Sequence, residues 1–176
     1  MKTASYLLIL IILASGCIGG GEKMKVSSVF EENGIIPKKY TCEGADINPP
    51  LRIENIPENA KTLAIIVEDP DAPGGTFIHW VAWNIPVTTE IPEGIPKEAV
   101  VEKPIHMIQG INDFGRVGYN GPCPPRSHGV HHYHFKIYAL DTELSLKPGS
   151  TKKELEKAMK GHILAEAELV GIYERK

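Results

Sequence analysis

The chain has 176 residues and a formal net charge of −3, with 42% hydrophobic and 23% charged residues. This length suits one folded domain, and the composition is ordinary for a globular protein. No basic stretch stands out, so nucleic acid is not an expected partner. The 14 prolines and 17 glycines are spread along the chain, which favours short strands joined by turns over a helical bundle.

Residues 1–16 have the pattern of a signal peptide. Lys2 precedes an apolar run over residues 6–13, and small residues then lead to Cys17. The run is short for a membrane span and typical of a signal-peptide core. Small residues that end at a cysteine predict a lipoprotein, with lipid on the Cys17 sulfur and residues 17–24 as a flexible tether. We therefore expect an exported protein anchored to the outer face of the cell membrane; secretion and an uncleaved anchor helix are the alternatives.

Two further cysteines, Cys42 and Cys123, remain if Cys17 carries lipid. Exported domains occupy compartments that permit disulfides. We predict that Cys42 and Cys123 are bonded, although a sequence alone does not establish that two distant cysteines meet.

Strand patterns dominate residues 25–176, the predicted folded domain. Three segments that are rich in apolar and β-branched residues and bounded by proline and glycine predict strands over residues 62–69, 77–85 and 131–140. Residues 86–117 contain many turn formers and predict a long irregular excursion.

The last quarter of the domain contains the clearest helix signal. Thr151 and Glu154 match a capping box in front of an apolar stripe, and Gly161 would end or kink the helix. The segment AELVGIYER would form a final strand. We therefore expect a mostly β fold with one or two helices near the C-terminus.

Alternation of side chains along the strands predicts which residues face inward. The more apolar face should point inward, and in strand 77–85 this set is Phe77, His79, Val81, Trp83 and Ile85. By the same rule Asp69, His131 and Tyr133 point inward from the other two strands, whereas His132 and His134 point outward.

An acid and imidazoles at the ends of inward faces need a physical explanation. Such groups must be paired, hydrated or bound to a ligand when they leave water. If the ends of the strands converge, Asp69, His79, His131 and Tyr133 line a polar pocket at the rim of a sheet. The alternative is a buried Asp–His hydrogen bond that only closes the sheet.

Several motifs resemble the phosphatidylethanolamine-binding protein family, and in particular its bacterial and archaeal Raf-kinase-inhibitor-like branch. DPDAP at 69–73, HW at 79–80, and GPCPP with HHY between 121 and 133 resemble the two signature regions. TCEGADINPPL, QGINDFG and AMKGHILAEAELVGIYER resemble the flanking segments of that branch. The resemblance runs from about residue 26 to the end of the chain.

The resemblance implies an antiparallel β-sandwich with peripheral helices and a small anion-binding pocket at one end. The implied ligand-binding residues are Asp69, Asp71, His79, Gly121, Pro125, His131 and Tyr133. The family also implies cis peptide bonds before Pro73 and Pro125. Two departures are His132, where many members have arginine, and Phe77, the nearest aromatic to His79 where members usually have tryptophan.

The implied function is non-enzymatic binding, without a cofactor, of a phosphate-bearing small molecule or a phospholipid head group. Imidazole, phenol and backbone N–H groups can donate to phosphate oxygens, and Asp69 can fix a histidine tautomer. Because a protonated histidine binds anions better, we expect affinity to rise as the pH falls toward about 6. A kinase partner is possible in this family, and inhibition of a serine protease through an exposed loop is the alternative function.

Two other kinds of chemistry are weaker hypotheses. Four histidines are close in sequence: His128, His131, His132 and His134. Alternation places His131 on the opposite face of the strand from His132 and His134, so we expect no functional metal. Ser127 or Cys123 near His131 could imitate a nucleophile and its base. The chain lacks a GxSxG motif, and we expect a protein that is not an enzyme.

Overall fold

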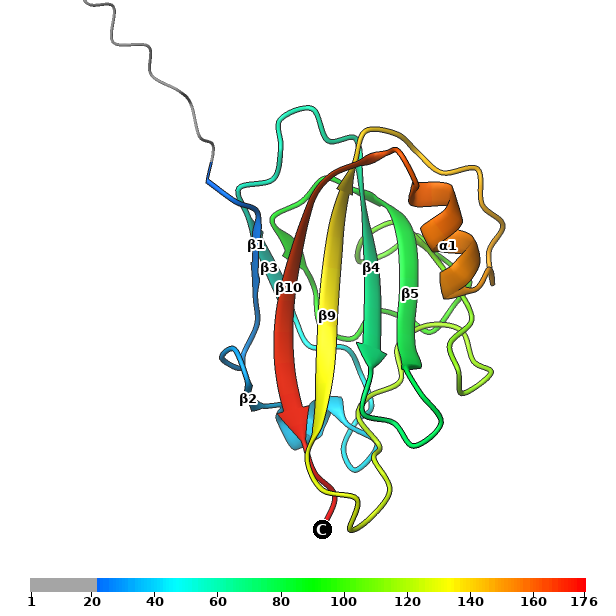
Figure 1. Cartoon of the computed structure of the whole chain (residues 1–176). Coiled ribbons are helices and arrows are strands. Elements are labelled where there is room, and N and C mark those ends of the chain that lie inside the picture. The colour runs from blue at the N-terminus through cyan, green and yellow to red at the C-terminus, as the bar shows by residue number, and fades with distance from the viewer. Residues whose placement is uncertain (1–21) are drawn as a thin grey trace, which may run out of the picture.

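The computed structural model describes residues 22–176, which form two sheets and a helix (Figure 1). The predicted signal peptide and Cys17 lie outside the described residues. Met24, at the end of the predicted tether, is buried in the core. No helix within residues 22–176 is long and apolar enough to span a membrane.

The larger sheet has seven strands in the order β2-β10-β9-β4-β5-β8-β7. These strands are β2 (Gly34–Ile35), β4 (Thr62–Asp69), β5 (Phe77–Pro86), β7 (Val100–Val101), β8 (Met107–Gln109), β9 (His131–Leu140) and β10 (Ile163–Tyr173). All neighbours run antiparallel except β2, which pairs with β10 in parallel over two residues. The three main predicted strands are confirmed as β4, β5 and β9, and the predicted final strand as β10.

A smaller sheet covers one face of the larger one and completes the sandwich. It contains β1 (Lys25–Ser27), β3 (Leu51–Glu54) and β6 (Glu90–Ile91), and a 3-10 turn, η1 (Lys38–Tyr40), precedes β3. The predicted antiparallel β-sandwich is therefore confirmed.

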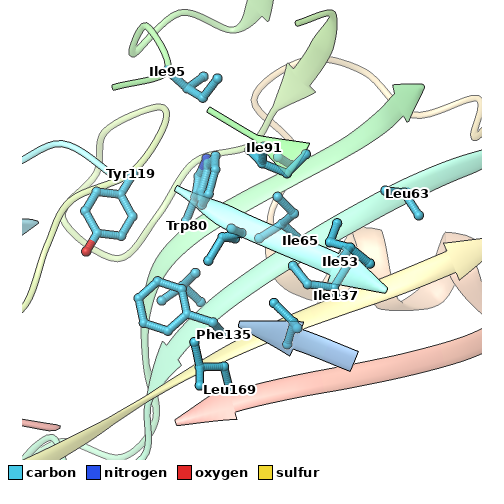
Figure 2. Packing of buried hydrophobic residues seen from close by; sticks show 14 of the residues in the cluster. Ile53, Leu63, Ile65, Trp80, Ile91, Ile95, Tyr119, Phe135, Ile137 and Leu169 are labelled. Carbon is cyan, nitrogen blue, oxygen red and sulfur yellow. The ribbon is translucent and has the colours of Figure 1, made fainter. Parts of the chain in front are cut away.

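The main hydrophobic core lies between the two sheets (Figure 2). Ile53 from β3 packs in the same fully buried cluster as Ile65 of β4 and Phe135 and Ile137 of β9. Burial of each such side chain contributes about 1.5–3 kcal/mol. This packing fixes β4 and β9 as a rigid central pair, so the residues at their ends have fixed positions.

The opposite face of the larger sheet is covered by α1 (Lys152–Met159). The predicted capping box is present, since Thr151 accepts from the Glu154 backbone and the Glu154 side chain accepts from Thr151. Leu155 and Met159 pack against residues of β4 and β5. Because β4 is buried on both faces, all eight of its residues are buried, which explains its nearly continuous apolar sequence.

A cluster of three charges ties α1 to the sheet. The Glu68 carboxylate, which is 7% exposed, accepts hydrogen bonds from Lys136 at 2.6 Å and from Lys152 of the helix. Burial alone would raise the pKa of Glu68, but the hydrogen bonds from the two lysines outweigh it and hold this pKa below its ordinary value.

The predicted inward set of β5 is wrong for Val81 and Trp83, which face the helix side. The register with β4 shifts twice, from Trp80↔Val67 to Ile78↔Glu68 and again between the partners of Ile65 and Leu63. Each shift is a β-bulge, which inserts a residue and reverses the alternation beyond it. Trp80 therefore joins the core between the sheets, and His79 is the inserted residue of the first bulge.

Candidate functional site

The candidate site lies where β4 ends and where β5 and β9 begin, at the lower end of the molecule in Figure 1. Asp69, the last residue of β4, pairs with Phe77, the first of β5. The ladder between β4 and β9 pairs Glu68 with His134, so one further step brings Asp69 opposite Tyr133. Three neighbouring strands thus present an acid, an aromatic ring and a phenol in one row at the rim.

These strand ends and the adjoining loops enclose a cavity of about 180 Å³. It is lined by Asp69, Ala72, Pro73, Phe77, His79, Phe114, Cys123, Pro124, Pro125, His131 and Tyr133. The acid, the two imidazoles and the phenol that alternation predicted to share inward faces are therefore brought together around one cavity.

Asp69 and His131 form a buried pair in the cavity wall. The two side chains are 5% and 1% exposed, and Asp69 Oδ2 lies 2.7 Å from His131 Nδ1. Asp69 Oδ1 accepts from the Asp71 backbone N–H at 2.8 Å. Because the carboxylate accepts, Nδ1 of His131 donates. His131 Nε2 lies 2.7 Å from Nδ1 of His128, so both ring nitrogens of His131 are engaged within the protein.

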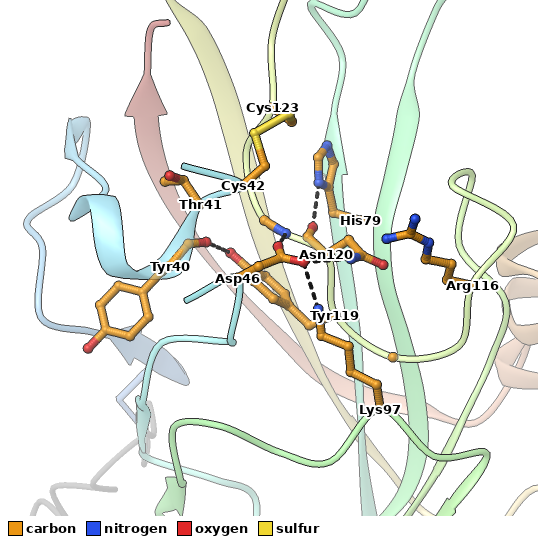
Figure 3. A network of polar contacts seen from close by, with 12 residues as sticks. Tyr40, Thr41, Cys42, Asp46, His79, Lys97, Arg116, Tyr119, Asn120 and Cys123 are labelled. Atoms are coloured by element: carbon orange, nitrogen blue, oxygen red, sulfur yellow. Dashed lines mark hydrogen bonds and ion pairs between the residues drawn. A yellow bond between two sulfur atoms is a disulfide. The ribbon is translucent and has the colours of Figure 1, made fainter. Parts of the chain in front are cut away.

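His79 is held by the backbone at Asn120. Its Nδ1 lies 2.7 Å from the Asn120 carbonyl oxygen, and its other ring nitrogen points away from Asn120 (Figure 3). Asn120 is itself fixed by its side chain, which donates to Asp46 and accepts from Asn112. Burial lowers the pKa of His79, and the hydrogen bond to the Asn120 carbonyl opposes this effect only in part.

Tyr133 lines the cavity and carries a buried hydroxyl group. The residue is 0% exposed, and its hydroxyl has no hydrogen-bond partner within the described part of the chain. Burial and then the negative charge of Asp69 raise the pKa of Tyr133 well above its ordinary value. The hydroxyl therefore keeps its proton and can serve as a donor.

The rest of the wall is apolar and aromatic. The rings of Phe77 and Phe114 lie 4.8 Å apart between centroids, and His79 packs against both at 5.4 and 5.3 Å. His79 also meets the Tyr133 ring edge-on at 5.2 Å. Phe77 therefore takes part in the wall, as the aromatic position near His79 suggested. No lysine or arginine is among the described residues that line the cavity.

A disulfide fixes the proline loop that closes the cavity. Cys42 and Cys123 are bonded, with their Cα atoms 5.4 Å apart, and the predicted pairing is confirmed. Because Cys123 lines the cavity, the bond holds this wall to the segment that follows η1. Arg175 also contacts the loop, 3.4 Å from the Pro124 carbonyl oxygen.

The predicted cis peptide bonds before Pro73 and Pro125 are wrong. Within residues 22–176 the only cis bond is Lys103–Pro104. The two loops turn by other means, since Gly75 and Ser127 adopt φ values of 104° and 63°. The hydrogen bond from the Asp71 backbone to Asp69 tightens the first loop further.

Asp71 and Gly121 lie near the cavity but do not line it. The Asp71 carboxylate is 41% exposed and accepts from the backbone and the ring of His132 on the outer face. Gly121 packs so closely that a Cβ would lie 2.1 Å from the Tyr40 carbonyl oxygen, and its N–H donates to Asp46. The contacts of both residues therefore lie outside the cavity, in the loops next to it.

The remaining histidines lie outside the cavity. His132 and His134 point outward, as predicted, and are paired with surface carboxylates. Among residues 22–176 no three potential ligand side chains come together as a metal site. Cys123 is bonded to Cys42 and therefore carries no free thiol.

Sequence reasoning missed Phe114, Asn120 and Asp46 as parts of the site. Phe114 and Asp46 lie within QGINDFG and TCEGADINPPL, so the resemblance contained a signal for these segments but not for the individual residues. Asn120 binds His79 through its backbone carbonyl, a group that every residue carries, so the residue type gave no direct signal for this contact.

Three comparisons with known proteins agree on the family. A family model described as phosphatidylethanolamine-binding protein matches residues 26–174. A UPF0098 protein of Pyrococcus abyssi is 71% identical over 178 aligned positions, which cover 100% of both chains. A UPF0098 protein of Pyrococcus horikoshii is 71% identical over 170 positions, covering 95% of this chain and 86% of that protein.

Solved structures show the same fold. A phosphatidylethanolamine-binding protein homolog of Chlamydia trachomatis is 43% identical with a TM-score of 0.79, over 88% of this chain and 99% of that one. YbcL of E. coli, described as a new member of the mammalian PEBP family, is 32% identical with a TM-score of 0.79, over 88% and 100% of the two chains. The chain therefore belongs to the phosphatidylethanolamine-binding protein family.

Proposed function

We propose that the cavity binds a small anionic, phosphate-bearing ligand and releases it unchanged. The buried Tyr133 hydroxyl carries this proposal, because Tyr133 lines the cavity and its hydroxyl has no hydrogen-bond partner within residues 22–176. A buried hydroxyl without a partner costs about 1–3 kcal/mol. A phosphate oxygen in the cavity would accept from Tyr133 and remove that cost.

The size and shape of the cavity favour a head group over a whole lipid. Its volume of about 180 Å³ is below the roughly 300–1,000 Å³ of pockets for drug-sized ligands. Phe77 and Phe114 leave an apolar wall for the carbon atoms next to the phosphate. The ligand class is thus a phosphorylated small molecule or the phosphate end of a phospholipid.

Titration of the purified protein with inorganic phosphate and with phosphorylethanolamine tests this proposal. Chemical shifts of the Tyr133 and His79 rings should change in proportion to occupancy, and Tyr133→Phe should weaken the affinity. Tyr138→Phe is the matched control, because it makes the same substitution in the same strand on the helix side. Equal affinity in Tyr133→Phe and wild type would rule out this cavity as the site.

We also propose that the domain is exported and anchored through lipid on Cys17. The Cys42–Cys123 disulfide supports export, because disulfides persist in oxidising compartments. Metabolic labelling with a radioactive fatty acid should mark the wild-type protein and not Cys17→Ser. Label on both proteins, or on neither, would contradict the anchor.

Kinase or serine protease inhibition remains a separate prediction. Such inhibition would use an exposed loop and need not involve the cavity. Inhibition of a purified serine protease that survives His79→Ala and His131→Ala would separate it from ligand binding.

A further inference from the structure

The two halves of the Cys42–Cys123 disulfide, drawn in Figure 3, differ in exposure. Cys42 is exposed, whereas Cys123 is half-buried between the buried residues Pro122 and Pro124 and lines the cavity. A thiolate in solution therefore reaches Cys42 more readily than Cys123. Exposed disulfides are the ones that exchange with thiols, because the rate depends on access to the attacked sulfur.

An arginine contacts the half-buried sulfur. Nη1 of Arg175 donates to Sγ of Cys123 at 3.5 Å and to the Pro124 carbonyl oxygen at 3.4 Å. The Arg175 carbonyl accepts from the Ser127 backbone at 3.5 Å, so the C-terminal segment holds this guanidinium against the proline loop (residues 121–130). A neighbouring guanidinium stabilises a thiolate, and a stabilised thiolate leaves faster. Cys123 is therefore the better leaving group of the two sulfurs.

Glu43 is the opposing charge beside this arginine. Its carboxylate lies 3.8 Å from Nε of Arg175 and 3.6 Å from Arg126. The Tyr173 hydroxyl also donates to this carboxylate, at 2.7 Å. Nη1 of Arg175 contacts the sulfur while Nε faces the carboxylate, and Glu43 shares its charge with Arg126. The guanidinium is therefore in place for a negative charge that develops on Cys123.

We propose that this disulfide is a thiol-exchange site with a fixed direction, at which a dithiol reductant opens the wall of the cavity. One thiolate of the reductant attacks Sγ of Cys42, the disulfide breaks, and Cys123 leaves with the electron pair as a thiolate beside Arg175. The second thiolate of the reductant then displaces Cys42 and closes the reductant into a disulfide. Two electrons pass to the two cysteines, and the thiol protons of the reductant go to water or to the released thiolates.

The exchange frees the proline loop from the segment that follows η1. The hydrogen bond from the Cys42 backbone to the Pro122 carbonyl oxygen, at 3.1 Å, does not involve the sulfurs. It keeps the two cysteines close after reduction and favours re-formation of the bond. The exchange needs no ligand in the cavity, so its test does not depend on the proposed binding of phosphate.

Brief treatment of the folded protein with an uncharged monothiol, β-mercaptoethanol, tests the direction. Acid quenching, alkylation and peptide mapping by mass spectrometry should locate the mixed disulfide at Cys42 and the alkyl group at Cys123. A mixed disulfide at Cys123, or equally at both cysteines, would overturn the direction. A bond that reacts only after denaturant is added is a purely structural crosslink, and that result would overturn the exchange site itself. The mapping captures the first step, so it holds even if the reduced protein later unfolds.

The rate of reduction by dithiothreitol under native conditions tests the role of Arg175. Arg175→Gln removes the charge and should slow reduction by about threefold or more, whereas Arg175→Lys should retain much of the wild-type rate. Arg126→Gln is the matched control and should leave the rate unchanged, because Arg126 lies in the same loop but pairs with Glu43 and the Lys176 backbone. A merely loosened loop would expose the disulfide and speed its reduction. Faster or unchanged reduction in Arg175→Gln would therefore contradict the role of this arginine.

Discussion

Tyr133→Phe should stabilise the ligand-free protein while it weakens ligand binding. The substitution removes one oxygen and keeps the ring, which packs in the main core at 0% exposure. The hydroxyl has no partner within residues 22–176, and an unpaired buried hydroxyl costs about 1–3 kcal/mol. Because water in the cavity can offset part of this cost, we expect a gain of about 1 kcal/mol in the free energy of unfolding, or about 2–4 °C in Tm.

The same substitution should reduce phosphate affinity. A hydrogen bond to a charged acceptor contributes about 1.5–3 kcal/mol, so its loss should weaken binding by about 10- to 150-fold. A variant that gains stability and loses function is expected where a binding group is kept unpaired for its ligand.

Guanidinium denaturation and phosphate titration of the same protein samples measure both effects. Tyr138→Phe is the matched control, since Tyr138 lies in the same strand and packs on the helix side. This control should leave phosphate affinity unchanged. A Tyr133→Phe protein that loses more than about 1 kcal/mol of stability, with unchanged affinity, would refute the idea that the hydroxyl is reserved for a ligand.

Three further substitutions probe the framework of the site. Glu68→Gln should lower the free energy of unfolding by about 1–2 kcal/mol. The loss is limited to this size because solvent partly screens the lysines that pair with Glu68. Because the folded-state pKa of Glu68 is depressed, the stabilisation by Glu68 is present at pH values above the ordinary pKa of 4.5 and is lost as the pH falls through the folded-state pKa. The unfolding free energies of wild type and Glu68→Gln, measured by denaturation, should therefore converge in acid. A difference that stays constant with pH would contradict the ion pairs. Replacement of both Cys42 and Cys123 by serine opens a loop with a sequence separation of 81 residues, for which chain entropy gives a loss of about 4.5 kcal/mol. Alkylation and mass spectrometry with and without reductant should detect the bond, and free thiols in the unreduced protein would disprove it. Thr151→Ala should cost about 1 kcal/mol through loss of the helix cap, and unchanged thermal stability would show that the cap contributes nothing.

Local patterns were sufficient to predict the four long strands and the helix, but not the six short strands, three of which lie in the predicted irregular excursion over residues 86–117. Strands β4 and β9 have the predicted bounds, residues 62–69 and 131–140, because apolar and β-branched runs bounded by proline and glycine are a local property of the chain. The capping box in front of α1 is local as well. Alternation correctly placed Tyr133 inward and His132 outward, since β9 pairs with β10 without a bulge through these positions.

Alternation failed in β5, where the pairing with β4 contains two bulges. The bulges of β5 moved Val81 and Trp83 to the helix side. A bulge depends on the register with the neighbouring strand, so one strand's own sequence does not reveal it. The loops around Pro73 and Pro125 turn at Gly75 and Ser127, which have positive φ values, and not through cis peptide bonds.

The sequence by itself determined the four long strands, the helix cap and the set of an acid, two imidazoles and a phenol that lies at the ends of inward faces. Only the tertiary structure decided how these groups are used. In the folded protein both nitrogens of His131 have hydrogen-bond partners, and Nδ1 of His79 is hydrogen-bonded to the Asn120 carbonyl. The Tyr133 hydroxyl has no partner within residues 22–176. The physical reason is that hydrogen-bond partners in this site come from segments distant in sequence, so the role of each atom is set when those segments pack together.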